Sequence, residues 1–336
     1  MYEKVKVIGA GGFGQVFLVR RTQEPRADDR TVAGQHYVIK RIFLQEDERG
    51  IRAAAVEVKV LQSIAPMPNI VSYYDHFVDD ENYINIVMEY CALGDLDRFL
   101  NARRRAGRWP LSVQEVLYLT FQLLAGTSHL HESGVLHRDL KPANIFLTWG
   151  NVDHGGLDSR LCEDSADDVD IVQLGQIDAT NLTLKVADFG ISHVMQNTLS
   201  FANTVIGTPF YIAPEIVESR PYTLSADVWA VGCIVYEIAS CGVRCFDGNN
   251  MLAVVQKIST GGVANFSLLA LEEDGDLQRR RNLLAVFDEM LMPMVRGMLC
   301  VDAKERLSVK EILQTHFAPS HADYVDDFED PTDYLV

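Results

Sequence analysis

Alternating apolar and polar positions characterise the chain as far as Glu89. Val5 to Val19 contains two strand-like runs around a glycine cluster, which predicts a β-hairpin, and Tyr37 to Lys40 predicts a third strand. Two further apolar runs, Ile70 to Phe77 and Tyr83 to Glu89, bring the expected number of strands to five. A small antiparallel sheet is therefore expected in the first part of the chain.

Helical spacing replaces this pattern after Gly94. One earlier helix is expected within Glu46 to Ile64, because the apolar residues Val56, Val60 and Ile64 lie four positions apart. Strands followed by helices predict an α+β fold, with a five-stranded lobe that holds one helix and a mainly helical second lobe. Its helices are predicted at Val113 to Glu132, Ser225 to Ser240, Met251 to Ile258, Val286 to Leu299 and Val309 to Gln314.

Composition is that of an ordinary globular protein, with 336 residues, 48% hydrophobic and 23% charged. The longest apolar run, Val228 to Ile238, is interrupted by Glu237 and is too short to span a bilayer, so we expect no membrane association. The first residues resemble no secretory signal, which favours a soluble intracellular protein. The six cysteines lack paired spacing and are expected to be free thiols without a metal or disulfide role.

Most of the net charge of −17 is concentrated in two segments. Residues 151–181 carry −7 and residues 318–336 carry −6, which leaves −4 for the rest. This distribution does not favour a nucleic-acid partner. The tail mixes acids with Tyr324, Phe328 and Tyr334, a composition suited to a partner-binding peptide.

A glycine cluster from Gly9 to Gly14 matches the pattern G-x-G-x-x-G, which alone is a weak signal. A strand containing Val16 follows, whereas a dinucleotide-binding fold needs a helix there, and no Gly-Lys-Ser/Thr of a Walker loop is present. Glycines let the backbone approach phosphate oxygens closely. The expected phosphate-binding residues are Gly9, Ala10, Gly11, Gly12, Phe13 and Gly14.

The segment His137 to Asn144 gives the strongest match in the chain, to H-R-D-x-x-x-x-N. Downstream, Asp188-Phe189-Gly190 and Ala213-Pro214-Glu215 follow in order, and Lys40 precedes all of them. With these residues the chain resembles the eukaryotic protein kinase superfamily from about residue 4 to 317. The resemblance implies one kinase domain with an N-lobe at 4–88, a hinge at 89–94 and a C-lobe at 95–317, followed by a tail at 318–336.

Smaller details resemble the NIMA-related (Nek) kinases, in particular Tyr37 to Lys40, Met88 to Cys91, Ala143 to Thr148 and Gly207 to Ile212. Lys141, two residues after Asp139, and Thr208 are typical of serine/threonine kinases. Residues 151–181 replace a turn that is short in the family. We expect a flexible surface excursion there, and the alternative is a docking element for basic partners.

The resemblance implies transfer of the ATP γ-phosphate to protein hydroxyls, with Mg²⁺ as the metal and Mn²⁺ as a substitute. Asp139 would accept the hydroxyl proton, Lys141 and Lys40 would neutralise phosphate charge, and Asn144 and Asp188 would bind metal. Asp95 is assigned to the ribose, although a helix N-cap is an equal alternative. The other implied nucleotide-site residues are Val16, Val38, Glu57 as the partner of Lys40, Met88, Glu89, Cys91 and Phe146.

Structural roles follow from the same resemblance. Asp227 would anchor the catalytic loop, Arg306 would pair with Glu215, and Leu61 would pack behind the site. The basic runs Arg103 to Arg105 and Arg279 to Arg281 are expected to be solvated faces.

Activation by phosphorylation is expected at Thr204, because a phosphate there would pair with Arg138 and order the loop. Ser200 and Thr198 are the fallback sites, and an unmodified Thr204 is the alternative.

Two other function classes were weighed. A pseudokinase scaffold is the main alternative, and Val38, which narrows the adenine pocket, supports it. A nucleotide-binding oxidoreductase is excluded because no helix follows the glycines. The expected partners are protein substrates, with docking partners at the insertion or the tail. We expect a monomer or weak dimer, and a cytoplasmic location with association to the cytoskeleton by family analogy.

Overall fold

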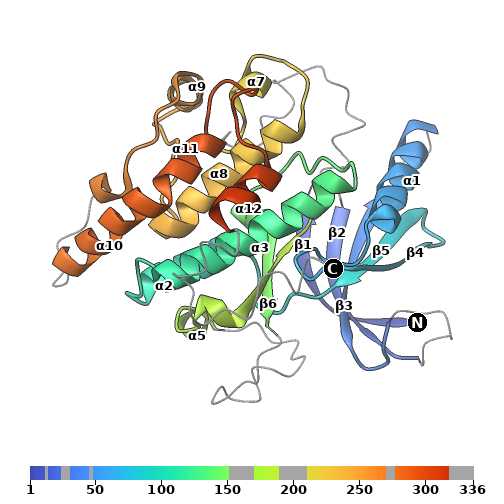
Figure 1. Cartoon of the computed structure of the whole chain (residues 1–336). Coiled ribbons are helices and arrows are strands. Elements are labelled where there is room, and N and C mark those ends of the chain that lie inside the picture. Colours follow the sequence, from blue (N-terminus) through green and yellow to red (C-terminus); the bar gives the residue numbers. More distant parts are fainter. Residues whose placement is uncertain are drawn as a thin grey trace.

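The computed structural model shows a small β-rich lobe beside a larger helical lobe (Figure 1). It describes residues 1–11, 14–23, 31–44, 48–150, 170–188, 210–269 and 277–317. Among these residues, no helix has the length and apolar character needed to cross a membrane. The predicted α+β, two-lobed kinase fold is confirmed.

The first lobe is built on a five-stranded antiparallel sheet. The hairpin, the third strand and the last strand all form where the alternating pattern predicts them. In spatial order the strands are β1 (Tyr2–Gly11), β2 (Gly14–Arg21), β3 (His36–Phe43), β5 (Tyr83–Glu89) and β4 (Tyr73–Val78).

The two faces of this sheet have different partners. Strand pairing places Val16 opposite Lys40 and Val38 opposite Met88, so these four side chains share one face. The other face carries its own buried apolar cluster of Phe17, Val19, Tyr37, Ile39 and Val87. The first face is the one from which Lys40 reaches the second lobe.

Helix α1 (Glu48–Ser63) forms as predicted, but its buried stripe differs. Val58 and Leu61 are buried, and Val60 and Ile64 of the expected row are partly buried against the same core, whereas Val56 is 37% exposed and does not belong to the buried face. Val58 and Leu61 are three positions apart, so they lie on one face of the helix, next to Val60 and Ile64.

The second lobe is organised around α8 (Leu224–Ser240), which is buried along nearly its whole length. The single helix predicted at 286–299 is wrong, because two helices, α10 (Leu277–Met290) and α11 (Met292–Met298), divide this stretch. Pro293 lies in the first turn of α11, where a proline is favoured. Helix α2 was not predicted. The other helices are α2 (Leu96–Arg105), α3 (Val113–Glu132), α7 (Pro214–Val217), α9 (Met251–Thr260), α10 (Leu277–Met290), α11 (Met292–Met298) and α12 (Val309–His316).

A two-stranded sheet lies beneath the junction of the lobes. It pairs β6 (Ile145–Trp149) with β7 (Leu182–Val186) in antiparallel fashion, and short 3₁₀ turns at Pro142–Asn144 and Ala179–Asn181 precede the two strands. Asn144 thus lies directly before β6, and Asp188 lies two residues after the last residue of β7. This small sheet positions both predicted metal ligands.

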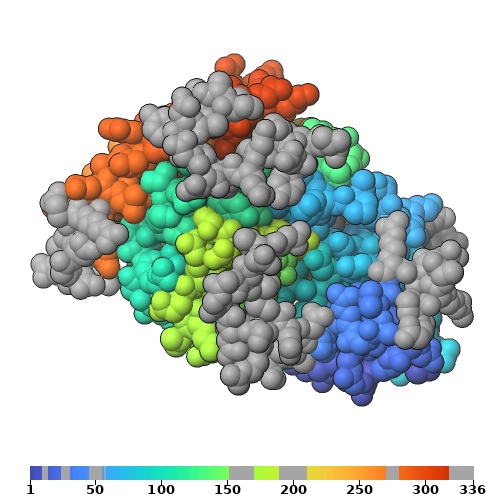
Figure 2. Space-filling view, turned by 60° about the horizontal axis from the view of Figure 1, so that its bottom comes forward, coloured from blue at the N-terminus to red at the C-terminus, as the bar shows by residue number. Residues whose placement is uncertain are grey.

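The prediction of a flexible surface excursion at 151–181 is wrong for residues 170–181, which pack on the second lobe. Residues 170–181 include the short helix α5 (Ile171–Leu174), and Leu174, Ile177 and Ala179 are buried. Gly175 packs so closely on α2 that a Cβ there would lie 2.5 Å from the Ala102 carbonyl oxygen. Figure 2 shows the yellow-green residues of this segment beside α2. Residues 151–169 lie outside the described part of the chain.

Arg103 corrects the expectation that its basic run is only a solvated face. Its side chain is buried and donates two hydrogen bonds to the Glu115 carboxylate, at 2.7 and 3.0 Å. It also donates to the Ile177 carbonyl oxygen at 3.0 Å, while Glu115 accepts from the Ala179 N–H at 3.1 Å. This ion pair therefore fixes residues 177–179 against α2 and α3.

Candidate active site

The glycine cluster forms the closed end of the β1–β2 hairpin. Gly9 pairs with Val16 and Gly11 pairs with Gly14. Gly14 has φ +134°, and a Cβ there would lie 2.0 Å from the Arg41 carbonyl oxygen, so only glycine fits. Predicted residues Gly12 and Phe13 lie outside the described residues, as do the side-chain surroundings of Ala10 and Gly11.

Lys40 connects the two lobes. Its Nζ lies 3.2 Å from the Asp188 Oδ1, and this contact joins β3 of the first lobe to the end of β7 in the second. Asp188 has φ +53°, a left-handed conformation that turns the chain sharply after the strand. Glu57, the expected partner of Lys40, lies on α1, but its side chain is outside the described residues.

The Asp139 carboxylate is held from one side. Its Oδ2 accepts hydrogen bonds from the Lys141 Nζ at 2.8 Å and from the Asn144 Nδ2 at 2.9 Å. Asn144 Nδ2 also donates to the Asp139 carbonyl oxygen at 2.7 Å. Within the described chain, the other oxygen, Oδ1, accepts no hydrogen bond, so the arrangement leaves one carboxylate oxygen for a ligand.

His137 is buried behind this carboxylate. Its Nε2 lies 2.8 Å from the Ala187 carbonyl oxygen, and its Nδ1 accepts from the Asp139 N–H at 3.3 Å. Because a carbonyl can only accept, the ring proton sits on Nε2. Burial lowers the pKa of His137 and outweighs the nearby carboxylates. A neutral imidazole therefore ties the residue before Asp188 to the backbone of Asp139.

Asp227 anchors the catalytic loop from below, as predicted. Its carboxylate accepts from the backbone N–H groups of His137 at 2.9 Å and Arg138 at 3.0 Å, and from the Tyr222 hydroxyl at 2.7 Å. Burial raises the pKa of Asp227, but hydrogen bonds from His131 and from these amides outweigh burial and hold the pKa below its ordinary value. The loop before Asp139 is therefore attached to α8.

A small apolar cluster lies beside the hinge. Val71, Cys91 and Ala187 are buried together, and Met88 and Phe146 pack against them. Val16 and Val38 share the sheet face that carries Met88. The structure thus brings together the predicted adenine-site residues Met88, Cys91 and Phe146, with Val38 on the same side.

Two predicted nucleotide-site residues have other partners. Glu89 accepts from the Ser72 N–H at 3.0 Å and pairs with Lys185 at 2.9 Å, so its carboxylate is occupied by protein groups. Asp95 is the N-cap of α2 and accepts from the Arg98 N–H at 2.8 Å, the alternative that the sequence left open. Burial raises the pKa of Asp95.

Lys185 is a residue that the sequence reasoning missed. Its side chain is 9% exposed, and besides Glu89 it contacts the Pro68 carbonyl oxygen at 2.8 Å. The signal was its position inside an apolar strand three residues before Asp188, where a lysine needs a buried partner.

Arg138 has φ +70°, and its Nε is buried without a hydrogen-bond partner among the described residues. The predicted regulatory residue Thr204 lies outside the described part, as do Thr198, Ser200 and Thr208.

The segment after residue 209 is fixed to the core. Glu215 and Arg306 form the predicted ion pair at 2.7 and 2.9 Å, buried on both sides. The Tyr211 hydroxyl donates to both oxygens of the Glu237 carboxylate, at 2.9 and 3.2 Å. Burial raises the pKa of Glu237 to about 7, against the opposing effects of Tyr211 and Arg244.

The donor set at Asn144 and Asp188 suits a hard divalent cation. One carboxylate and one amide oxygen are ligands that Mg²⁺ accepts when substrate phosphates complete its shell. No group of three or more His, Cys, Asp or Glu side chains suited to a metal occurs within the described ranges. Five cysteines that the structure describes are free thiols.

Comparison with known proteins gives the family. The family model described as "Protein kinase domain" matches residues 2–318. The chain is 34% identical over 261 residues to serine/threonine-protein kinase Nek1 of Mus musculus, covering 77% of this chain and 18% of that protein. It is 30% identical over 320 residues to Nek4 of Mus musculus, covering 95% of this chain and 33% of that protein.

A shorter relative gives a similar match. Serine/threonine-protein kinase nekl-2 of Caenorhabditis elegans is 34% identical over 266 residues, which cover 77% of this chain and 62% of that protein. The chain thus spans less than two thirds of each of these three relatives. Because the kinase-domain match extends over nearly all of its residues, the chain belongs to the protein kinase family.

Proposed function

We propose that this chain is a serine/threonine protein kinase of the NIMA-related type, which transfers the γ-phosphate of Mg-ATP to protein hydroxyls. The observation that supports this best is that the Lys40–Asp188 pair and the Asp139–Asn144 pair are linked, because the N–H of Ala187, the residue before Asp188, donates to the Asn144 carbonyl oxygen at 3.0 Å. The similarity to Nek serine/threonine kinases supports the choice of acceptor.

The reaction assigns a distinct task to each oxygen of Asp139. Lys141 and Asn144 hold Oδ2, so Oδ1 is available to accept the proton of a serine or threonine hydroxyl. The hydroxyl oxygen then forms a bond to the γ-phosphorus, and the bond from that phosphorus to the β,γ-bridging oxygen breaks. ADP leaves with the bonding electrons, and Asp139 holds the proton.

Charge neutralisation is the second task. The transferring phosphoryl group spreads negative charge over its oxygens, which requires fixed cations more than covalent help. Lys40 and Lys141 supply two of them, and Asn144 and Asp188 would hold Mg²⁺, with Mn²⁺ as a substitute. The Asn144 amide oxygen suits this role because its Nδ2 is already committed to Asp139.

Activation through Thr204 is part of the proposal. A phosphate near Arg138 would gain charge-assisted hydrogen bonds, and the buried Nε of Arg138 lacks a partner in the described chain. Phosphosite mapping of active enzyme and a Thr204→Ala variant test this step, and Ser200→Ala and Thr198→Ala test the two fallback sites. Full activity of Thr204→Ala would remove Thr204 from the account.

Partners and location follow by family analogy alone. We propose protein substrates, a cytoplasmic site of action with cytoskeletal association, and a monomer or weak dimer.

The test of the acceptor is direct. Purified full chain is incubated with γ-labelled ATP, Mg²⁺ and a basic protein substrate, and the labelled amino acids are separated after hydrolysis. Phosphoserine and phosphothreonine are expected. Label found only on tyrosine, or no label although ATP binds, would overturn the proposal, and the second result would favour a pseudokinase scaffold.

A further inference from the structure

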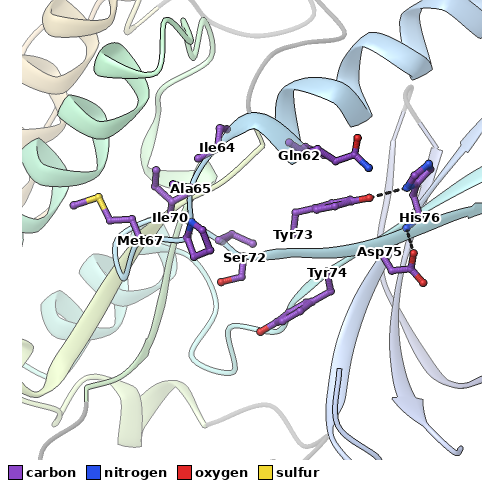
Figure 3. A pocket seen from close by; sticks show the side chains of 13 residues that line it. Gln62, Ile64, Ala65, Met67, Ile70, Ser72, Tyr73, Tyr74, Asp75 and His76 are labelled. Atoms are coloured by element: carbon purple, nitrogen blue, oxygen red, sulfur yellow. Dashed lines mark hydrogen bonds between the residues drawn. The ribbon is translucent and has the colours of Figure 1, made fainter. Parts of the chain in front are cut away.

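A pocket in the described part of the chain is lined by neither Lys40 nor Asp188. It has a volume of about 490 Å³ and is enclosed by the end of α1, the loop that follows and β4 (Figure 3). Leu61, Ile64 and Met67 supply apolar walls. At its other end the Tyr73 hydroxyl and the His76 Nδ1 lie 2.6 Å apart. An aromatic side chain with a polar edge suits such a lining.

The loop that forms this pocket is bonded directly to the active site. Ser72 donates to the hinge residue Glu89, and the Pro68 carbonyl accepts from Lys185. Val71 N–H donates to the Val186 carbonyl at 3.0 Å, and Val186 N–H donates to the Asn69 carbonyl at 2.9 Å. Val71 also belongs to the apolar cluster beside the hinge. A ligand in the pocket would therefore contact a loop that holds both the hinge and the strand before Asp188.

The last described residue, Phe317, packs against helix α3, and α3 extends from there toward the pocket. The Phe317 ring packs on Phe121 of α3, with ring centroids 5.7 Å apart. Further along α3, the His129 Nε2 lies 3.0 Å from the carbonyl oxygen of Ala65, a pocket residue. The helical path from Phe121 to His129 is about 12 Å long, and about four extended residues cover that distance. The chain continues for 19 residues beyond Phe317.

The chemistry of that continuation fits the pocket. It contains Tyr324 and Phe328 among six acids, without lysine or arginine. Lys59 is exposed and lies one helical turn before the pocket residue Gln62, so it is placed at the rim. His129 lies at the same rim, and Asp75 is the one acidic side chain in the lining.

We propose that the α1–β4 pocket is the docking site of this chain's own tail, residues 318–336. Phe328, or Tyr324 four positions before it, would insert between Leu61 and Tyr73. The docking itself is independent of catalysis. Its consequence, an altered affinity for ATP through the loop at 65–72, rests on the proposed kinase function.

A photo-crosslinking amino acid at position 328 of the full chain tests the docking. Irradiation should produce crosslinks within one chain to residues of the pocket, located by mass spectrometry. The same crosslinker at Leu268, which is 75% exposed in the second lobe, should give none there. Ala65→Trp, an exposed position that lines the pocket, should lower the yield at least about five-fold, equivalent to about 1 kcal/mol. Ser63→Trp is the matched control, because Ser63 is exposed on the same turn but does not line the pocket.

Each remaining outcome decides the question. Crosslinks between two copies would assign the pocket to a second chain and overturn the proposal, as would crosslinks elsewhere or a yield insensitive to Ala65→Trp in a variant whose unfolding temperature is unchanged. Asp139→Asn should leave the crosslink intact, so loss of activity and loss of docking are measured separately. Phe328→Asp in the full chain should then shift the KM for ATP without abolishing transfer.

Discussion

The Lys40 Nζ and the Asp188 Oδ1 lie 3.2 Å apart although 148 positions separate them along the chain. The contact joins a sheet strand of the first lobe to the end of β7 in the second lobe. A lysine and a carboxylate at this junction suit a metal-bound triphosphate, because the lysine can contact phosphate oxygens and the carboxylate a metal ion. The relative position of the two lobes is therefore part of the site.

Replacing this lysine tests its role in neutralising phosphate charge. Lys40→Met should lower kcat/KM by about 10²- to 10³-fold, the usual cost of removing one group that stabilises transition-state charge. Steady-state kinetics at fixed Mg²⁺ measure the effect. Lys310→Met, an exposed change on α12, is the matched control and should have no effect. Equal rates for both variants would exclude Lys40 from the site.

Arg103 gives a prediction for stability. Arg103→Met leaves the Glu115 carboxylate buried without its partner, so the free energy of unfolding should fall by about 3 to 5 kcal/mol. Its neighbour Arg104 is exposed, and Arg104→Met should change stability by less than about 0.5 kcal/mol. Denaturant titrations of both variants decide whether this basic run is structural.

Glu237 predicts a specific pH dependence. Its pKa is raised by burial from 4.5 to about 7, so between these values the folded state retains a proton that the unfolded state has lost. The stabilising contribution is complete below about pH 4.5 and is lost as the pH rises through 7. Tyr211 and Arg244 oppose the rise in the pKa of Glu237, and Asp97 adds to it.

Glu237→Gln should remove this slope. The variant should match the parent at pH 4 and exceed its unfolding free energy by about 3 kcal/mol at pH 8, since each pKa unit corresponds to about 1.36 kcal/mol. Denaturant unfolding at several pH values is the measurement. Glu305→Gln, at an exposed position, should leave the slope unchanged. Parallel curves for all three proteins would contradict the assignment.

The acidic insertion can be divided by deletion. Removing 152–168 should preserve both peptide phosphorylation and thermal stability, because the buried residues Leu174, Ile177 and Ala179 are kept. Extending the deletion to 178 removes Leu174 and Ile177, which are buried, and should cost about 2 kcal/mol or more for each side chain. If the short deletion abolishes activity, the insertion takes part in catalysis; if the long one is harmless, the packing argument is wrong.

The sequence predicted the elements whose pattern is local. Each of the five strands formed near its predicted position, because alternation and turn residues act over a few positions. Asp227 and the pair of Glu215 with Arg306 were identified by resemblance, and the structure gives each the expected partner.

What sequence reasoning missed depends on distant partners. Arg103 looked like a surface charge because Glu115, which neutralises it, lies on another helix. Lys185 is explained only by the hinge residue Glu89. On α1 only Val56 was misassigned, because a four-residue spacing alone does not fix the edge of the buried face. The pocket beside α1 involves residues from three elements, and no local motif marks it.

The proposed kinase activity depends on Asp139, which accepts the hydroxyl proton during phosphoryl transfer. The most direct measurement is the single-turnover rate of γ-phosphate transfer from Mg-ATP to a serine peptide, compared between the parent, Asp139→Asn and the exposed control Asp80→Asn. Asp139→Asn is expected to lower the transfer rate by about 10²- to 10⁴-fold while ATP still binds, because a general base is lost. The rate of Asp80→Asn is expected to equal that of the parent. Equal transfer by Asp139→Asn and the parent would contradict the proposed role of Asp139.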